Sequence, residues 1–380
     1  MAFHYSPAQL KASLLSHGIG FEMDIFSDLK QEFYENQFVY NQTSKSVLPK
    51  HRFPQAILLD NDVISAVLRR DGSPWRLSSN GANLNLTLRG EHVAHITLPE
   101  KPTYFGKVLR DGTLAEHVIA VAGERIPGFF LYPDCAYFSE GVPCSFCSVK
   151  GTRRSAGKNL VADPSLEQIA EATQLFQKTK WKDIPLVFVT TGSFPNSDEG
   201  AKYTARVIRT IYDSLDPKLP IHLLTTPPDS LDLIDKFKDS GVTTIAFNLE
   251  VFDRETFAEI CPGKQRFVGY DKFLAALDHA KNSFGDYNAF CGFVWGLEPT
   301  ESTIDGYKYC LDRGISISSN VFHADPKSVF ANKPHPTVEQ IAEICSEQYR
   351  LYKSYPQAGT IFPVSMRSTM DFEIYRGDSI

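Results

Sequence analysis

Residues 128–150 read GFFLYPDCAYFSEGVPCSFCSVK, and the interpretation of the whole chain starts from them. The apolar run at 128–133 is typical of a buried strand, and Cys135, Cys144 and Cys147 follow it. Eight residues separate the first two thiols and two separate the last pair. Three thiolates with no other Cys or His nearby lack the fourth ligand of a tetrahedral zinc site. A [4Fe-4S] cluster with one iron open to a small-molecule ligand fits this set better.

Composition places the chain among ordinary globular proteins. Of its 380 residues, 42% are hydrophobic and 22% are charged, so disorder is not expected. The net charge of -6 argues against a broad nucleic-acid surface and favours a small or local partner. No 18-residue apolar segment occurs, and the first 18 residues lack the pattern of a secretory signal, so no membrane association is expected.

Cysteine usage indicates a reducing compartment. Seven cysteines are an odd number and do not suggest a secreted disulfide framework, so we expect a cytoplasmic protein. The four cysteines outside the motif are scattered among apolar residues and are predicted to be buried free thiols: Cys261, Cys291, Cys310 and Cys345.

The chain divides into three predicted parts. Residues 1–125 form an N-terminal β-rich accessory region, with one helix near the start and short strand-like runs broken by turn signals from about 38 to 122. Residues 126–332 alternate strand and helix. Residues 333–380 give a C-terminal helix, VEQIAEICSEQYRLYKSY, and a tail expected to fold over the domain before it.

The middle part predicts a parallel sheet. Amphipathic helical runs separate six strand candidates, at 128–133, 185–192, 221–226, 243–250, 288–298 and 315–322. Six β/α units indicate an α/β fold in which the sheet curves into a partial (β/α)6 TIM-type barrel. Functional groups of such sheets gather at the C-terminal ends of strands, where Cys135 lies relative to the first strand.

At this point the sequence resembles the radical S-adenosylmethionine (SAM) superfamily, in its biotin-synthase-like form. Cys144-Ser145-Phe146-Cys147 matches the second half of the family's CxxxCxΦC motif, where Φ is aromatic, although the first spacing here is eight residues. The segment from Gly292 to Glu298 looks like the family's GxIxGxxE strand. Asn248-Leu249-Glu250 looks like its ribose contact, and Thr191-Gly192-Ser193 occupies the place of its GGE motif, which receives the methionine amino group.

The resemblance implies a role for each of these residues. Cys135, Cys144 and Cys147 would hold the [4Fe-4S] cluster, and the open iron would bind the amino and carboxylate groups of SAM. The cofactor-binding residues would be Phe146, Thr191, Gly192, Ser193, Asn248, Glu250, Arg266, Gly292, Val294, Gly296 and Glu298, with Trp295 offering further apolar surface for adenine.

Other polar residues are weaker candidates. Lys150, Arg153 and Arg154 follow the motif and, like Arg266, are cations able to meet a carboxylate. His323 and Asp325 follow the sixth strand and are expected at the barrel mouth, where substrate enters. We also expect the N-terminal region or the tail to cap that mouth, because radical chemistry needs a closed cavity.

The resemblance implies an enzyme that cleaves SAM reductively to a 5'-deoxyadenosyl radical. The radical would abstract hydrogen from a small organic substrate, as in cofactor or secondary-metabolite biosynthesis. An external low-potential electron donor of the flavodoxin or ferredoxin type is implied as a partner, and nucleic acid is not favoured. Alternatives that stay open are an RNA- or peptide-modifying enzyme of the same superfamily, and a non-catalytic iron-sulfur or zinc protein.

Overall fold

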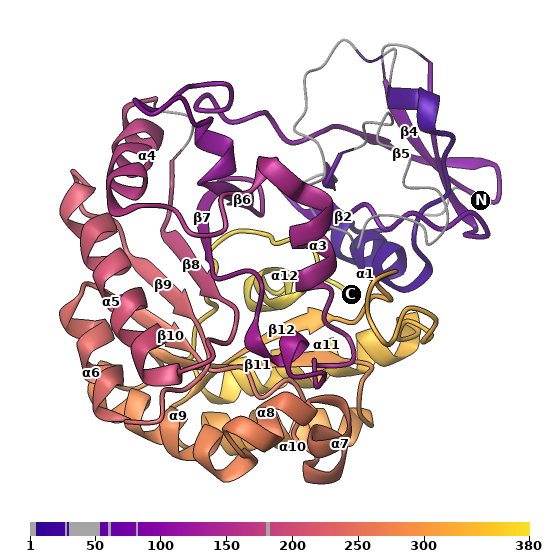
Figure 1. Cartoon of the computed structure of the whole chain (residues 1–380). Coiled ribbons are helices and arrows are strands. Elements are labelled where there is room, and N and C mark those ends of the chain that lie inside the picture. Colours follow the sequence, from indigo (N-terminus) through magenta and orange to yellow (C-terminus); the bar gives the residue numbers. More distant parts are fainter. Residues whose placement is uncertain (1–4, 27–28, 30–53, 60–61, 81–82, 180–182) are drawn as a thin grey trace.

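A curled seven-stranded sheet dominates the structure, a computed structural model that describes residues 5–26, 29, 54–59, 62–80, 83–179 and 183–380. The strand order is β12-β11-β10-β9-β8-β7-β6. The strands are β6 (Ala120–Ala122), β7 (Ile126–Leu131), β8 (Val187–Thr191), β9 (Ile221–Leu224), β10 (Thr244–Ala246), β11 (Ala289–Trp295) and β12 (Ser316–Val321). The sheet forms an open half-barrel with helices on its outer side (Figure 1).

The six predicted strands correspond to β7 through β12. Each pairs with the next in parallel, which confirms the α/β class and the partial TIM-type barrel. β6 adds an antiparallel strand beside β7, a pairing that the sequence did not indicate. All seven residues of β11 are buried, as expected for a parallel strand covered on both faces.

Helices follow the parallel strands and cover the convex face of the sheet. Two short helices, α2 (Ala136–Ser139) and α3 (Val149–Ala156), precede α4. The outer helices are α4 (Leu166–Lys178), α5 (Ser197–Ser214), α6 (Asp232–Asp239), α7 (Arg254–Ile260), α8 (Pro262–Phe267), α9 (Tyr270–Phe284) and α10 (Thr300–Leu311). Ser165 begins α4 with a capping box to Gln168, which fixes where that helix starts.

The C-terminal segment closes the floor of the half-barrel. After α11 (Val338–Ser354), Phe362 packs edge-on against Phe188, with ring centres 5.3 Å apart, and against His222. Both partners lie near the N-terminal starts of their strands, at the end opposite the cysteines. The described tail therefore fills the floor and does not cover the mouth.

The same tail covers the free edge of β12. The amide of Val321 donates to the Ser368 carbonyl at 2.8 Å. The Ser319 amide donates to the carboxylate of Asp371, at the start of α12 (Asp371–Arg376), also at 2.8 Å. Pairing of these amides removes an edge that would otherwise be open to other chains.

The described part of the N-terminal region is β-rich, as predicted, and its residues 30–53 lie outside the described residues. It contains α1 (Pro7–His17), a hairpin of β1 (Ala56–Leu58) and β2 (Ile64–Ala66), and an antiparallel sheet of β3 (Trp75–Ser79), β4 (Leu84–Leu88) and β5 (Glu91–Ile96).

One buried lysine of α1 connects this region to the tail. Lys11 Nζ lies 2.8 Å from a carboxylate oxygen of Glu373 in α12 and donates to the Met366 carbonyl at 2.6 Å. Both charged side chains are completely buried. β6 lies before the predicted boundary at 125/126 and the tail lies after the one at 332/333, yet both are part of the barrel. The two boundaries therefore stay predictions.

Within the described ranges, no helix has the length and apolar character needed to cross a bilayer.

Candidate functional site

Residues 134–150, hereafter the cysteine loop, follow β7 and carry the three predicted cluster cysteines. Cys135 has a φ of 46°, a conformation uncommon for residues other than glycine. The next amide, of Ala136, donates to the Ser193 carbonyl at 2.7 Å and so ties this turn to the end of β8. The position of Cys135, after β7, is therefore fixed by the segment that follows β8.

The segment Thr191-Gly192-Ser193 lies directly against this turn. A Cβ atom on Gly192 would stand 2.3 Å from the Tyr132 carbonyl and 3.0 Å from the Cβ of Cys135, so only glycine allows the contact. Thr191 Oγ1 lies 2.7 Å from Thr225 Oγ1 on the neighbouring strand. The segment is next to the cysteine loop, as expected for a cofactor-binding position, and its contact with methionine stays a prediction.

Burial and mutual charge govern the thiols. Cys135 and Cys144 are buried and Cys147 is half-buried. Burial raises the pKa of Cys147, and the neighbouring thiols of Cys144 and Cys135 raise it further. A hydrogen bond with Cys261 lowers the pKa of Cys144, burial opposes this, and the positive charge of Lys264 supports it. The three thiols therefore lie near enough to influence one another's ionisation.

This donor set fits an iron-sulfur cluster better than one metal ion. Over the described ranges, no three His, Cys, Asp or Glu side chains form a group that could hold a single ion. Zinc needs its ligands at roughly 2.0–2.3 Å from one point. The cysteines of a [4Fe-4S] cluster instead bind different iron atoms and can stand farther apart. Three thiolates are the ligands that such a cluster uses, so these residues fit it.

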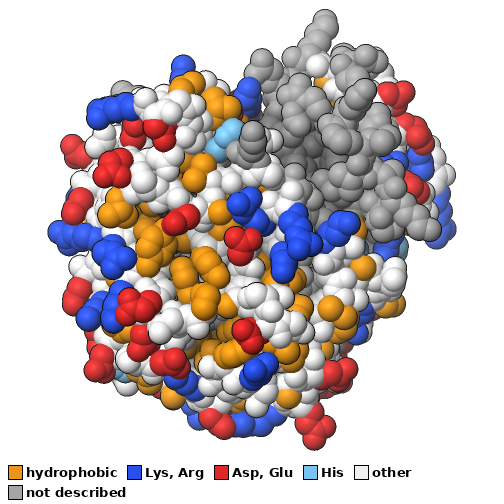
Figure 2. All heavy atoms as spheres, viewed as in Figure 1, with side chains coloured by type: hydrophobic (Ala, Val, Ile, Leu, Met, Phe, Trp, Pro, Cys, Tyr) orange, Lys and Arg blue, Asp and Glu red, His pale blue; other side chains and the backbone are white. Residues whose placement is uncertain are grey.

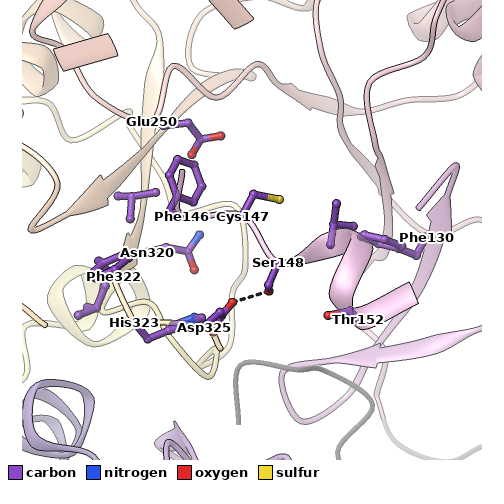
Figure 3. Close-up of a pocket in the computed structure, with 13 residues that line it drawn as sticks. Phe130, Phe146, Cys147, Ser148, Thr152, Glu250, Asn320, Phe322, His323 and Asp325 are labelled. Carbon is purple, nitrogen blue, oxygen red and sulfur yellow. Dashed lines mark hydrogen bonds and ion pairs between the residues drawn. The ribbon is translucent and has the colours of Figure 1, made fainter. Parts of the chain in front are cut away.

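A cavity of about 250 Å³ adjoins the cysteine loop at the C-terminal ends of the strands (Figure 3). Phe146 and Val294, the two residues predicted to contact adenine, both face it. Its lining combines apolar side chains with the carboxylate of Glu250 and with polar residues from the cysteine loop, α3 and the end of β12. The full lining is Phe130, Phe146, Cys147, Ser148, Val149, Thr152, Glu250, Val294, Asn320, Val321, Phe322, His323 and Asp325.

Two polar side chains after β10 have the properties expected of ligand-binding groups. Glu250 has a φ of 78°, and its backbone bonds to β11 on both sides, through the Gly292 carbonyl and the Val294 amide. Such conformations in non-glycine residues gather at functional sites. Asn248 Oδ1 is buried without a hydrogen-bond partner among the described residues, so it is available to a hydroxyl donor. Both agree with the predicted ribose contacts.

Strand β11 presents alternate residues to the two faces of the sheet. Gly292 faces inward, where a Cβ atom would stand 2.3 Å from Asn248 Oδ1, so this glycine makes room for the asparagine. Trp295 faces outward: its Nε1 donates to the Tyr307 hydroxyl of α10 at 2.5 Å. The expectation that Trp295 offers surface to adenine is therefore wrong, because its neighbour Val294 takes the inward position.

Gly296 and Glu298, the last two fixed positions of the predicted GxIxGxxE match, make structural contacts. Glu298 accepts hydrogen bonds from the amides of Phe252 and Asp253, each at 2.8 Å, and from the Thr303 hydroxyl at 3.0 Å. Burial raises the pKa of this carboxyl. Glu298 thus holds the loop after β10, and neither it nor Gly296 lines the cavity. Gly296, with a φ of 86°, packs against Pro336.

The structure separates two cations of α8, and a contact between Arg266 and SAM stays a prediction. Arg266 is exposed, with its guanidinium 4.8 Å from the centre of the Phe267 ring, and it does not line the cavity. Lys264 is buried and donates to a carboxylate oxygen of Glu250 and to the Asn248 carbonyl, both at 2.6 Å. In the sequence, Lys264 is marked only by its position at the start of a short helix after Pro262. A single lysine there forms no pattern that would have identified it as a buried residue.

The cations after the motif lie outside the cavity. Lys150, Arg153 and Arg154 are on α3, where Lys150 lies above the Phe138 ring and Arg153 donates to the Gly157 carbonyl at 3.2 Å. None of the three lines the cavity beside the cysteine loop.

The residues after β12 do line the cavity and bond to the cysteine loop. Asp325 accepts a hydrogen bond from the hydroxyl of Ser148, the residue after Cys147, and its other oxygen lies 2.8 Å from His323 Nδ1 (Figure 3). Asp325 is buried. His323 and Asp325 therefore lie beside the cysteine loop, together with Ser148, which the sequence did not single out; their contact with substrate stays a prediction.

Comparison with known families decides the assignment. The family described as the Radical SAM superfamily matches residues 131–322, just over half of the chain. The chain belongs to the radical SAM superfamily. The match runs from the end of β7 to the residue after β12 and so includes the cysteine loop and all the strand ends that border the cavity.

Two curated proteins illustrate the range of relatives of this radical SAM enzyme. Bacteriochlorophyllide c C-7(1)-hydroxylase of Chlorobaculum limnaeum is 21% identical over 315 residues, which cover 80% of this chain and 78% of that protein. Lipoyl synthase of Chlamydia caviae is 28% identical over 177 residues, which cover 46% of this chain and 52% of that protein. The chain thus spans about half the length of the lipoyl synthase that it matches.

Two solved structures are also similar. Methylornithine synthase (PylB) has a TM-score of 0.46 at 18% identity, covering 61% of this chain and 63% of that one. HydG, a maturase of the [FeFe]-hydrogenase, has a TM-score of 0.49 at 17% identity, covering 70% of this chain and 58% of that one.

Proposed function

We propose that this radical SAM enzyme holds a [4Fe-4S] cluster on Cys135, Cys144 and Cys147 and uses SAM to abstract hydrogen from a small organic substrate. The observation that carries the proposal is that the cysteine loop, the inward side of β11 and Glu250 border one cavity, while Asn248 packs against Gly292 on that inward side. A reduced [4Fe-4S] cluster held there would supply one electron to the sulfonium of SAM, which would give methionine and a 5'-deoxyadenosyl radical.

The protein's own residues bind, orient and exclude water in this proposal. Asn248 and Glu250 accept hydrogen bonds from the ribose hydroxyls, and Phe146 and Val294 give adenine its apolar surface. The floor formed by Phe362 and its neighbours excludes water from below. An external low-potential donor of the flavodoxin or ferredoxin type delivers the electron, and the reducing cytoplasm inferred from cysteine usage suits it.

The cavity beside the cysteine loop is compact. Its volume of about 250 Å³ lies just below the roughly 300–1,000 Å³ of ordinary ligand pockets. Acidic and basic side chains are interspersed over the described part of the face in Figure 2, which also suits a small molecule better than a nucleic-acid backbone. We therefore favour a small molecule over RNA or a folded protein.

Anaerobic reconstitution tests the proposal. We expect four iron and four sulfide per chain and dithionite-dependent release of 5'-deoxyadenosine from SAM, both abolished in Cys144→Ala. Cys345→Ala is the matched control, because this thiol is also buried but belongs to α11, outside the cavity lining. Bound zinc without sulfide in the wild-type protein, or full 5'-deoxyadenosine release by Cys144→Ala, would refute the proposal.

A second candidate is hydroxylation of a substrate like that named for the relative from Chlorobaculum limnaeum. It is favoured by the extent of that likeness, which covers 80% of this chain and so reaches beyond the cysteine loop and the strand ends. Incubation of the reconstituted enzyme with bacteriochlorophyllide c, SAM and dithionite tests it by mass spectrometry. A product one oxygen heavier supports this candidate, and unchanged substrate beside ongoing SAM cleavage excludes it.

A further inference from the structure

The turn between α7 and α8 packs tightly on the cysteine loop. The amide of Ser145, next to Cys144, donates to the Ile260 carbonyl at 2.8 Å. A Cβ atom on Gly263 would stand 2.5 Å from the Tyr137 ring and 2.6 Å from the Val142 carbonyl, so the two segments touch on both sides of Cys144. Whatever this turn carries on its inner side lies close to the second cluster cysteine.

The turn carries a buried positive charge. Lys264 is 7% exposed, and its Nζ lies 2.6 Å from a carboxylate oxygen of Glu250 and 2.6 Å from the Asn248 carbonyl. Burial alone lowers the pKa of this amine, but the Glu250 carboxylate and the thiols of Cys144 and Cys261 outweigh it and raise the pKa overall. The close ion pair with Glu250 keeps this buried amine in its charged form at neutral pH.

The same ammonium thus reaches two parts of the site. On one side it fixes one oxygen of Glu250, the carboxylate that lines the cavity. On the other side, the turn that carries it packs against the residues that flank Cys144 in the cysteine loop. A positive charge held beside a cluster stabilises the reduced, more negative state and raises its potential.

We propose that Lys264 is a positioning residue that orients Glu250 toward SAM and, through its fixed charge beside Cys144, raises the reduction potential of the cluster. This inference rests on the proposed function, since it needs a cluster on the cysteine loop. It predicts opposite effects for the two members of one ion pair. Loss of the lysine charge lowers the potential, whereas loss of the glutamate charge leaves the ammonium unopposed and raises it.

The test measures the midpoint potential of the reconstituted cluster without SAM, by spectroscopic redox titration. At a fixed solution potential, Lys264→Met should lower the ratio of reduced to oxidised cluster about tenfold, a shift of 59 mV for one electron. Glu250→Gln should raise the same ratio, and Lys264→Arg should stay within twofold of wild type. Arg266→Met is the matched control: it removes a cation from the same helix, but an exposed one, and should leave the ratio unchanged.

Lys264→Met leaves a carboxylate buried without its partner, which threatens folding. The double variant Lys264→Met/Glu250→Gln removes both charges and keeps the measurement possible, and its potential should fall between those of the single variants. SAM affinity, measured by equilibrium dialysis, should fall at least fivefold in Lys264→Met and recover in Lys264→Arg.

The outcomes separate the two proposals. A wild-type protein that takes up no iron and sulfide overturns the proposed function and this inference with it. If the wild-type protein holds a cluster, but its ratio of reduced to oxidised cluster differs less than twofold from that of both single variants and the double variant, only the role of Lys264 is overturned. A shift of the same sign in both single variants also overturns it, because a merely structural role would disturb the site in one direction.

Discussion

Replacing Gly292 by alanine is the sharpest test of the cofactor side of the cavity. The added Cβ atom would lie 2.3 Å from Oδ1, 2.4 Å from Cγ and 2.5 Å from Nδ2 of Asn248. Contacts under 3.0 Å do not occur for real Cβ atoms, so the asparagine must move. Its Oδ1 is the buried acceptor proposed to receive a ribose hydroxyl.

The magnitude follows from two effects. Forcing one extra methyl group into a packed interior costs about 1–3 kcal/mol of folding stability. Moving the amide away from ribose loses one neutral hydrogen bond, worth about 1 kcal/mol, or up to about 1.4 kcal/mol if the group is left poorly placed. That difference weakens SAM binding about five- to tenfold.

The assay is equilibrium dialysis of SAM against anaerobically reconstituted protein, with urea unfolding measured in parallel. Gly128→Ala is the matched control, because Gly128 also lies in a strand of this sheet, but its Cβ atom would meet nothing closer than 3.8 Å. It should bind SAM like wild type. A folded Gly292→Ala protein with wild-type affinity, or an equal loss in Gly128→Ala, refutes the placement of Asn248 at the ribose.

Three further predictions concern the framework around the site. Burial raises the pKa of Asp371 to about 6 from its ordinary 3.8. The folded protein therefore binds a proton more readily than the unfolded chain between these values. Stability should fall by about 2 kcal/mol as pH rises from 4 to 6, out of about 3 kcal/mol over the whole titration, and this slope should be missing from the urea midpoints of Asp371→Asn. Lys11→Met should destabilise the protein by about 3–5 kcal/mol, because it leaves the Glu373 carboxylate buried alone. Lys11→Met/Glu373→Gln should restore most of the lost stability. Equal urea midpoints for the two variants would contradict this. Trp295→Phe should lower the folding stability by about 1–3 kcal/mol, because it removes the donor to the Tyr307 hydroxyl. It should leave SAM affinity unchanged. A loss of affinity would place the indole at the cofactor.

Much of the barrel could be predicted because its signals are local. Each parallel strand is a short apolar run followed by an amphipathic helix, and a parallel sheet follows from that alternation. The inward position of Val294 follows from the two-residue period of β11, and the same period excludes Trp295. The error over Trp295 came from treating neighbours in the sequence as neighbours in the cavity.

What could not be predicted depends on contacts between distant segments. The sequence around Lys264 and Arg266 offers two similar cations, and only the packing of the α7–α8 turn on the cysteine loop buries one and exposes the other. Glu298 matched a motif position, yet the amides of Phe252 and Asp253 occupy its carboxylate. The hydrogen bond from Ser148 to Asp325 spans 177 residues and leaves no local pattern.

The buried bond between Lys11 and Glu373 has a consequence for how the protein is made. During synthesis, the first helix emerges long before its charge partner and must wait for nearly the whole chain to leave the ribosome. Until then the outer amides of β12 at Ser319 and Val321 are also unmatched. Any shortened chain that stops before Ser365 should therefore be a client of chaperones and prone to self-association.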